Sequence, residues 1–294
     1  MNNSTRYRNL KRRLNEYIDP PDLEDYQWQL VNNIKHIIQS NYFRKRPHIR
    51  ILDSGCDTTG RQLWYLSNLT TGGIYGINNA RDFPNDSSEK YTRKNVTILN
   101  MNGMDLKFPD QSFDMVISAN VMEHVGDPEK YIRECCRTLK NNGIAYFEAC
   151  PIWTSARGHH IHDDMVAKNC PDENNYRNDG SVIPDWSHLI LSKTEMRSLL
   201  ETKLKPGTCE YILNYLYRSN NLNRKGWREI KSELEGVFTE VKTSTYLVRE
   251  PDNNPKFKDG LEDHDVFGFS AVCRRKQQNH ISKRLILLLR RLGL

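Results

Sequence analysis

The residues best suited to acid–base chemistry lie in one short segment, GHHIHDD, at positions 158–164. Histidine titrates near neutral pH, so its imidazole can accept a proton from a reacting hydroxyl group. The side chains of His159, His160 and His162 cannot all point into one site from an extended loop. We therefore expect His159 and His160 to be the catalytic candidates and His162 to contact the substrate.

Two further aromatic residues are expected to complete a substrate pocket beside this segment. Trp153 lies in the preceding PIWTSARG and would form a wall, and His188 in DWSHLILS would return to the same pocket. Two other interpretations of the histidine segment stay open. Its His and Asp side chains also suit a divalent metal ion. A solvated polar loop explains any single histidine equally well. No pattern of supporting residues around the histidines is readable, so we predict no metal site.

Polar or small residues also follow each of four short apolar segments. They are Asp53, Ser54, Gly55, Cys56 and Asp57 after the first, Asn78 and Asn79 after the second, Asn102, Gly103, Met104 and Asp105 after the third, and Asn120, Glu123 and His124 after the fourth. Glycine lets a backbone approach a ligand closely, and a helix N-terminus offers free N–H groups. Asparagine can bond a hydroxyl group, although it is also common in turns.

Strands alternating with helices must position these residues. We expect strands at 49–52, 73–78, 95–101, 113–120 and 144–150, and helices at 60–69 and 127–139. Such alternation predicts parallel βαβ units in an α/β fold. Ligands of open parallel sheets bind outside the carboxyl ends of the strands, so the four polar groups should meet in one site.

The chain before and after this core is expected to add a helical cap and a functional insertion. Residues 1–47 are basic and then amphipathic, and Asp22 would cap a helix that starts near Leu23. Apolar residues near helical spacing in that helix are Trp28, Val31, Ile34, Ile37 and Ile38. Residues 151–192 are a long polar segment of a kind that is usually functional. Helices at 193–204 and 207–235 and an antiparallel strand pair at 238–248 and 266–275 would follow.

Composition limits the class of protein. The 294 residues suit one large α/β domain with additions, and the net charge of +6 is far below that of a dedicated nucleic-acid binder. No secretory signal and no run of about 18 apolar residues is visible, which predicts a cytoplasmic protein. The seven cysteines form no CxxC pair, so we expect buried free thiols in a reducing compartment.

A longer stretch carries a family resemblance. The sequence MDLKFPDQSFDMVISANVMEHVGDPEKYIRECCRTLKNNGIAYFEACP resembles class I S-adenosylmethionine-dependent methyltransferases of the type 11 group. That family reads roughly D-x-LPF-x-D-x-SFD-x-V-x-S-x-x-V-x-EHV-x-D, followed by a helix and R-x-LKPGG. The match covers residues 49–150 and is most specific over 105–147. It implies a Rossmann-like, doubly wound, mostly parallel seven-stranded sheet and S-adenosyl-L-methionine as cofactor.

The resemblance also implies roles by position. Asp53 and Gly55, with Cys56 and Gly60 of the same loop, would lie along the methionine and ribose of the cofactor. Asn78 would hold the ribose hydroxyls, and Asn120 would lie beside the methionine end. The adenine would be bracketed by Asn102, Gly103 and Met104. The pair Glu123-His124 would start the helix after the fourth strand and orient cofactor or acceptor, which makes both residues further catalytic candidates. Helix capping explains the pair equally well.

Some residues depart from the family pattern at the cofactor contacts. Asp57 replaces the second glycine of the first loop, and Thr59-Gly60 suggests one extra residue. Asn78 and Asn102 stand where the family has acids. A methyltransferase fold that has lost activity and serves as a binding or scaffold protein is therefore an alternative. A nicotinamide-dependent dehydrogenase fits poorly, because the first loop lacks GxGxxG.

A shorter resemblance suggests the acceptor. PIWTSARGHH is similar to methyltransferases associated with bacterial surface-polysaccharide gene clusters, which implies a sugar hydroxyl or glycan precursor as acceptor. Another small molecule is the alternative, and we predict no nucleic-acid partner. The expected domains are a cap (1–47), the methyltransferase domain (48–276, with the acceptor-binding part at 151–235) and a basic amphipathic helix (277–294). Residues 280–294 would either lie on an anionic membrane or pack on protein.

Overall fold

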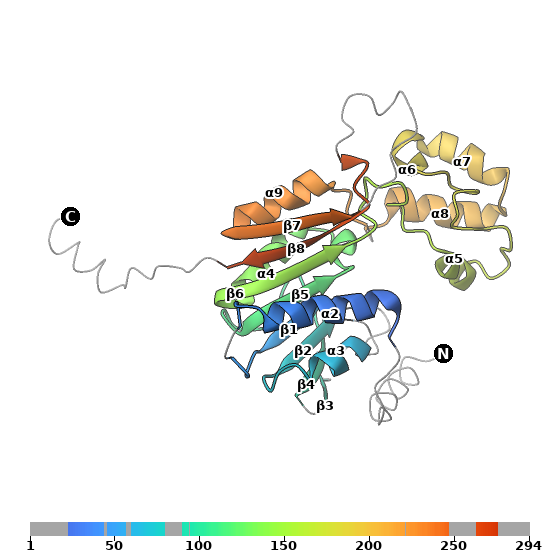
Figure 1. Ribbon diagram of the computed structural model, residues 1–294. Helices are drawn as coiled ribbons and strands as arrows, with labels where there is room; N and C mark the ends of the chain where they lie inside the picture. Colours follow the sequence, from blue (N-terminus) through green and yellow to red (C-terminus); the bar gives the residue numbers. More distant parts are fainter. Residues whose placement is uncertain are drawn as a thin grey trace, which may run out of the picture.

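The computed structural model describes residues 23–43, 46–56, 60–79, 90–93, 95–220, 222–246 and 263–275. These form one eight-stranded sheet in the order β3-β4-β2-β1-β5-β6-β8-β7 (Figure 1). The strands are β1 (Ile51–Ser54), β2 (Ile74–Asn78), β3 (Lys90–Arg93), β4 (Val96–Asn100), β5 (Phe113–Ala119), β6 (Leu139–Ala149), β7 (Glu240–Tyr246) and β8 (Gly268–Arg274).

The pairing of the strands confirms the predicted fold class. Strands β4, β2, β1, β5 and β6 run parallel to one another, and β7 and β8 close the sheet as the expected antiparallel pair. Strand β3 pairs antiparallel with β4 and adds an edge strand to the seven that the sequence predicts.

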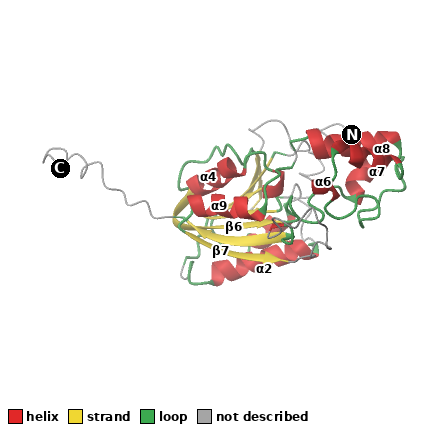
Figure 2. Cartoon of the chain, turned by 90° about the horizontal axis from the view of Figure 1, so that it is seen from above, coloured by secondary structure: helices red, strands yellow, loops and turns green. Residues whose placement is uncertain are grey.

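Helices cover both faces of the sheet. The helices of the described residues are α2 (Asp25–Gln39), α3 (Arg61–Leu66), the 3-10 helix η1 (Met122–His124), α4 (Pro128–Thr138), α5 (Asp163–Asn169), α6 (Ser187–Ile190), α7 (Lys193–Glu201), α8 (Pro206–Arg218) and α9 (Trp227–Val237). Figure 2 shows α4 and α9 on one side of the strands and α2 on the other. None of the helices in the described ranges is long and apolar enough to cross a bilayer.

Alternation along the central strands supplies two separate cores. Ile51 and Ile117 pack with Ile34 of α2, whereas their neighbours Leu52 and Val116 pack on the α4 and α9 side. Successive strand residues point to opposite faces, so one apolar run can fill both layers. A third cluster, formed by α5, α7 and α8, lies beside the end of the sheet (Figure 1) and occupies the position of the predicted insertion.

Two helix boundaries and one buried helix face differ from the expected ones. Helix α2 begins at Asp25 with Glu24 as its N-cap, and Asp22 lies outside the described residues. Trp28 is 40% exposed and its ring contacts that of Tyr65, so the buried face of α2 is centred instead on Leu30, Val31 and Ile34. The helical range expected at 207–235 is two helices, α8 and α9, separated by the polar segment 219–226.

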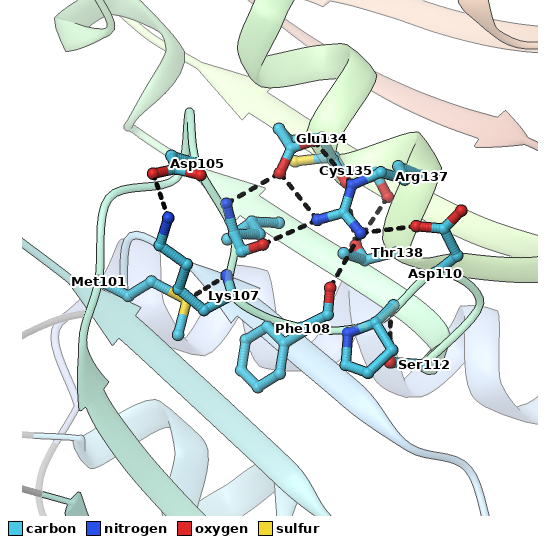
Figure 3. Close-up of polar contacts among 12 residues, drawn as sticks. Met101, Asp105, Lys107, Phe108, Asp110, Ser112, Glu134, Cys135, Arg137 and Thr138 are labelled. Atoms are coloured by element: carbon cyan, nitrogen blue, oxygen red, sulfur yellow. Dashed lines mark hydrogen bonds and ion pairs between the residues drawn. The ribbon is translucent and has the colours of Figure 1, made fainter. Parts of the chain in front are cut away.

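Arg137 of α4 fastens the loop that follows β4. Its guanidinium donates to the carbonyl oxygens of Leu106 (2.8 Å) and Phe108 (2.9 Å) and pairs with the carboxylates of Asp110 and Glu134 (Figure 3). Its planar fork satisfies several acceptors at once, which a lysine ammonium cannot do in the same geometry. The loop therefore keeps a fixed position relative to α4.

We expect Arg137→Lys to lower the free energy of unfolding by about 1–3 kcal/mol, because it leaves at least one loop carbonyl without its donor. Urea unfolding of the full chain measures this. Arg133→Lys is the matched control on the same helix, since Arg133 bonds only the exposed Glu129 carboxylate among the contacts described, and such surface pairs contribute about 0–1 kcal/mol. Equal losses in the two variants would contradict this role of Arg137.

Candidate active site

A cavity of about 260 Å³ opens where β1, β2, β4 and β5 end. Six of the residues predicted to bind the cofactor line it: Gly55, Asn78, Asn102, Gly103, Met104 and Asn120. Residues of the same loops that the sequence did not single out for the cofactor, such as Ser54, Asn79, Met101 and Val121, also line it, as does Tyr131 from α4. The four strand ends therefore meet in one site, as expected.

Backbone bonds fold the first loop against β2. Gly55 has a φ of +95°, and a Cβ there would lie 2.1 Å from Val121 Cγ2, so only glycine fits. The N–H groups of Gly55 and Cys56 both donate to Ile77 O at 2.9 Å. The side-chain amide of Asn78 donates to Cys56 O at 2.7 Å. Asn78 thus fixes the shape of the loop as well as lining the cavity.

The other residues of this loop that were predicted to bind the cofactor do not line the cavity and instead support the loop. Asp53 is buried and accepts a hydrogen bond from the Gln62 side chain at 2.7 Å, and Gly60 is the N-cap of α3 with a φ of +66°. Neither of them, nor Cys56, is among the residues that line the cavity. Residues 57–59, which carry the departures Asp57 and Thr59, lie outside the described residues.

The loop after β4 forms the opposite wall. Asn102 Oδ1 accepts from the Met104 N–H at 2.9 Å, which closes a turn around Gly103. A Cβ on Gly103 would lie 2.5 Å from Tyr131 Cε2 and 3.1 Å from Ser54 Oγ, so the glycine allows these side chains to approach the turn. Ser54 Oγ is buried and has no hydrogen-bond partner within the described chain. A glycine-lined cradle with an unsatisfied hydroxyl fits a polar ligand with a flat ring.

A second cavity of about 970 Å³ adjoins the first. It shares Asn79, Met104 and His124 with the first cavity and continues to the segment 220–225 between α8 and α9. His124 ends η1 and is the predicted catalytic residue that lines both cavities. The sequence analysis missed segment 220–225. Its run of asparagines, SNNLN, within a predicted helical range was the available signal.

The histidines of GHHIH and Trp153 are not among the residues that line these two cavities. The His160 ring packs edge-on against His124 with centroids 4.8 Å apart, and its Nε2 lies 2.5 Å from Pro151 O. The carbonyl accepts, so Nε2 carries the proton. Burial, together with the neighbouring His124, lowers the pKa of His160 to about 3. His162 is exposed and lies 6.0 Å from the His160 ring.

His159 and His188 form a second layer with Trp153. His159 Nδ1 accepts from the Ile161 N–H at 3.1 Å, and His188 Nε2 donates to Trp153 O at 2.8 Å. Burial lowers the pKa of His188 to about 4 and holds the pKa of His159 well below its usual range. In the part of the chain that the structure describes, no three or more His, Cys, Asp or Glu side chains are grouped as metal ligands.

Glu123 precedes His124 and is buried. Its carboxyl oxygens have no hydrogen-bond partner of good geometry among the described residues. Burial, with a smaller effect from the charge of Glu148, raises the pKa of Glu123 to about 8. The carboxyl group is therefore largely protonated and uncharged at neutral pH.

Comparison with known proteins decides the family. Residues 52–147 match the model of the methyltransferase domain. This match supports a class I S-adenosylmethionine-dependent methyltransferase domain over residues 52–147, about a third of the chain. Its family and cofactor are those predicted from the sequence.

Individual relatives resemble only part of the chain. A 2-methyl-6-phytyl-1,4-hydroquinone methyltransferase of Oryza sativa subsp. japonica is 30% identical over 35% of this chain and 29% of its own length. A probable S-adenosylmethionine-dependent methyltransferase of Mycobacterium tuberculosis is 37% identical over 17% of this chain and 18% of its own. The chain thus spans less than a third of the curated relatives it matches. The crystal structure of the YcgJ protein from Bacillus subtilis is 12% identical, with a TM-score of 0.45 over 85% of this chain and 99% of that one.

The Glu123 carboxyl group should make the stability of the methyltransferase domain depend on pH. The unfolded chain loses this proton near the ordinary value of 4.5, whereas the folded chain keeps it to about pH 8. Between these values the folded state binds the extra proton, so the free energy of unfolding falls as pH rises, by an order of a few kcal/mol. We expect Glu123→Gln to remove this part of the pH dependence.

Urea unfolding at pH 5.5 and pH 8 measures the effect. The stability of Glu123→Gln relative to the wild type should increase between the two values. Glu129→Gln is the control, since Glu129 is an exposed carboxylate of α4 paired with Arg133. A difference between Glu123→Gln and the wild type that does not change with pH would contradict the protonated state of Glu123.

Proposed function

We propose that the chain transfers the methyl group of S-adenosylmethionine to an acceptor bound in the second cavity, and that His124 is the base. One observation carries this proposal: His124 lines both cavities, at the place where they meet. The cofactor supplies a sulfonium methyl group that an acceptor atom displaces in line. The chain's own part is to hold the acceptor beside the first cavity and to take up the proton that a hydroxyl acceptor loses.

In this proposal the histidines predicted as bases support His124 instead. A neutral imidazole with a pKa of about 3 is a weak proton acceptor at neutral pH, and His160 Nε2 already donates to Pro151 O. Its edge-on packing restricts the His124 ring, so His160 is a positioning residue. His159, His188 and Trp153 lie further back and support the loop that carries His160.

We propose a hydroxyl group of a sugar or glycan precursor in surface-polysaccharide biosynthesis as the acceptor. The similarity of PIWTSARGHH to polysaccharide-associated methyltransferases supports this class. The second cavity is also lined by the asparagines Asn79 and Asn220, and each type of amide atom can bond a sugar hydroxyl. The names of the curated relatives refer to hydroquinone and sterol methylation, so another small molecule is the second candidate.

We expect His124→Asn to reduce methyl transfer by about 10²-fold or more, because it removes the proton acceptor at the junction. The rate is measured as S-adenosylhomocysteine formation with a panel of sugar nucleotides and glycan-lipid extracts. His162→Asn should keep nearly normal activity, since His162 is exposed and lines neither cavity.

Calorimetric titration with S-adenosylhomocysteine separates this mechanism from a scaffold function. Both variants should bind it within a few-fold of the wild type. Full turnover in His124→Asn would reject His124 as the base, and binding without turnover on any acceptor would favour the scaffold alternative.

We further propose that the chain is cytoplasmic and that residues 280–294, which lie outside the described residues, contact an anionic membrane surface. Basic residues flanking an apolar helical face favour such binding. The intact chain should sediment with phosphatidylglycerol vesicles, and a chain without residues 280–294 should not. Equal sedimentation of the two chains would contradict the proposal.

A further inference from the structure

One wall of the second cavity is formed by Asn220 and by residues 222–225, between α8 and α9. Asn223 attaches this segment to η1: its N–H donates to Glu123 O at 2.9 Å, and its side-chain amide donates to Met122 O. Asn223 is buried. The residues on either side of it are therefore held at a fixed position relative to His124, the next residue of η1.

Two cations of this segment line the cavity. Arg224 and Lys225 are its charged lining residues, and none of the described residues that line it is acidic. Lys225 Nζ pairs with Glu233 of α9. Arg224 forms no ion pair with a carboxylate of the described residues. No carboxylate among these residues therefore neutralises its positive charge at the cavity wall.

Arg224 is nevertheless held in place. Its Nη2 donates to the carbonyl oxygen of Leu216, in the last turn of α8, at 2.7 Å. Its guanidinium carbon lies 5.4 Å from the centroid of the Trp153 ring, a cation–π contact. A guanidinium has five N–H donors in a rigid plane, so other donors remain for a ligand while the side chain is already ordered. Ordering a side chain before binding lowers the cost of the contact it will make.

We propose that Arg224 and Lys225 bind a phosphate group of the acceptor. This rests on the proposed function, because it takes the second cavity as the acceptor site. The planar fork of arginine matches pairs of phosphate oxygens. The Lys225 ammonium pairs with Glu233 and has two further N–H donors for the same group. The cavity of about 970 Å³ is far larger than a phosphate, so the rest of the acceptor has room to extend to His124. The acceptor is thus a phosphorylated molecule, such as a sugar phosphate or diphosphate.

Calorimetric titration of the full chain with inorganic pyrophosphate, at constant ionic strength, tests this. Arg224→Met keeps the apolar stem on Trp153 and removes the donors, so the dissociation constant should rise about tenfold or more. Arg224→Lys keeps the charge without the fork and should give an intermediate loss. Arg228→Met is the matched control: this exposed arginine of α9 pairs with Asp263 and does not line the cavity, so its affinity should equal that of the wild type.

Each outcome decides the proposal. Unchanged pyrophosphate affinity in Arg224→Met, or no binding to the wild type, would overturn it. Tighter binding of malonate than of pyrophosphate would also overturn it, because a carboxylate would then be the better ligand. Thermal unfolding of each variant shows whether it is folded. S-adenosylhomocysteine titration of the same samples tests the proposed function separately, since its failure there leaves pyrophosphate binding unaffected.

Discussion

The site depends on the parallel pairing of β1 with β2 on one side and β5 on the other. Ile51, Leu52 and Asp53 align with residues of both neighbours, so the loops after all three strands leave the sheet at the same edge. The apolar residues of these strands are buried on both faces and fix the register, because a shift of one residue would exchange the two cores. The parallel pairing of β2 with β4 brings the loop that carries Asn102 to the same edge.

The second cavity depends on a different kind of contact. Its far wall belongs to a segment that is about a hundred residues away in sequence and is attached to η1 by Asn223. The helices α5, α7 and α8 form a core of their own, and α8 leads directly into this segment. In the proposed function the insertion supplies the acceptor side and the sheet supplies the cofactor side, and His124 lines both cavities.

Local patterns were enough to predict most of the polar residues that line the first cavity. Gly55, Asn78, Asn102 and Gly103 line the cavity because a strand end and its turn are adjacent in sequence, so a strand pattern places them directly. Asp53, Cys56 and Gly60 belong to the same loop, but which of its residues face the ligand depends on bonds such as that of Gln62 to Asp53. The alternation of apolar and polar residues in the sequence does not predict such side-chain hydrogen bonds.

The surroundings of the second cavity could be predicted only in part. The sequence predicted that 151–192 is functional, and His160 of this segment packs against His124, but the bonds of His160 to Pro151 O and of His188 to Trp153 O are tertiary features. No sequence pattern predicted that Arg224 lines a cavity. Its position depends on its contacts with Leu216 and Trp153 and on the attachment of its neighbour Asn223 to η1. Long-range contacts decide such positions, and they have no periodicity to read.

Hydrogen–deuterium exchange of the full chain with and without S-adenosylhomocysteine tests the central claim most directly, because it reads out the whole backbone at once. The account predicts slower exchange in the loops after β1, β2 and β4 and in η1, at residues 54–56, 78–79, 101–104 and 120–125. The helices α5 and α7 should exchange as before. Protection absent from these loops, or confined to the insertion, would contradict a cofactor site at the strand ends.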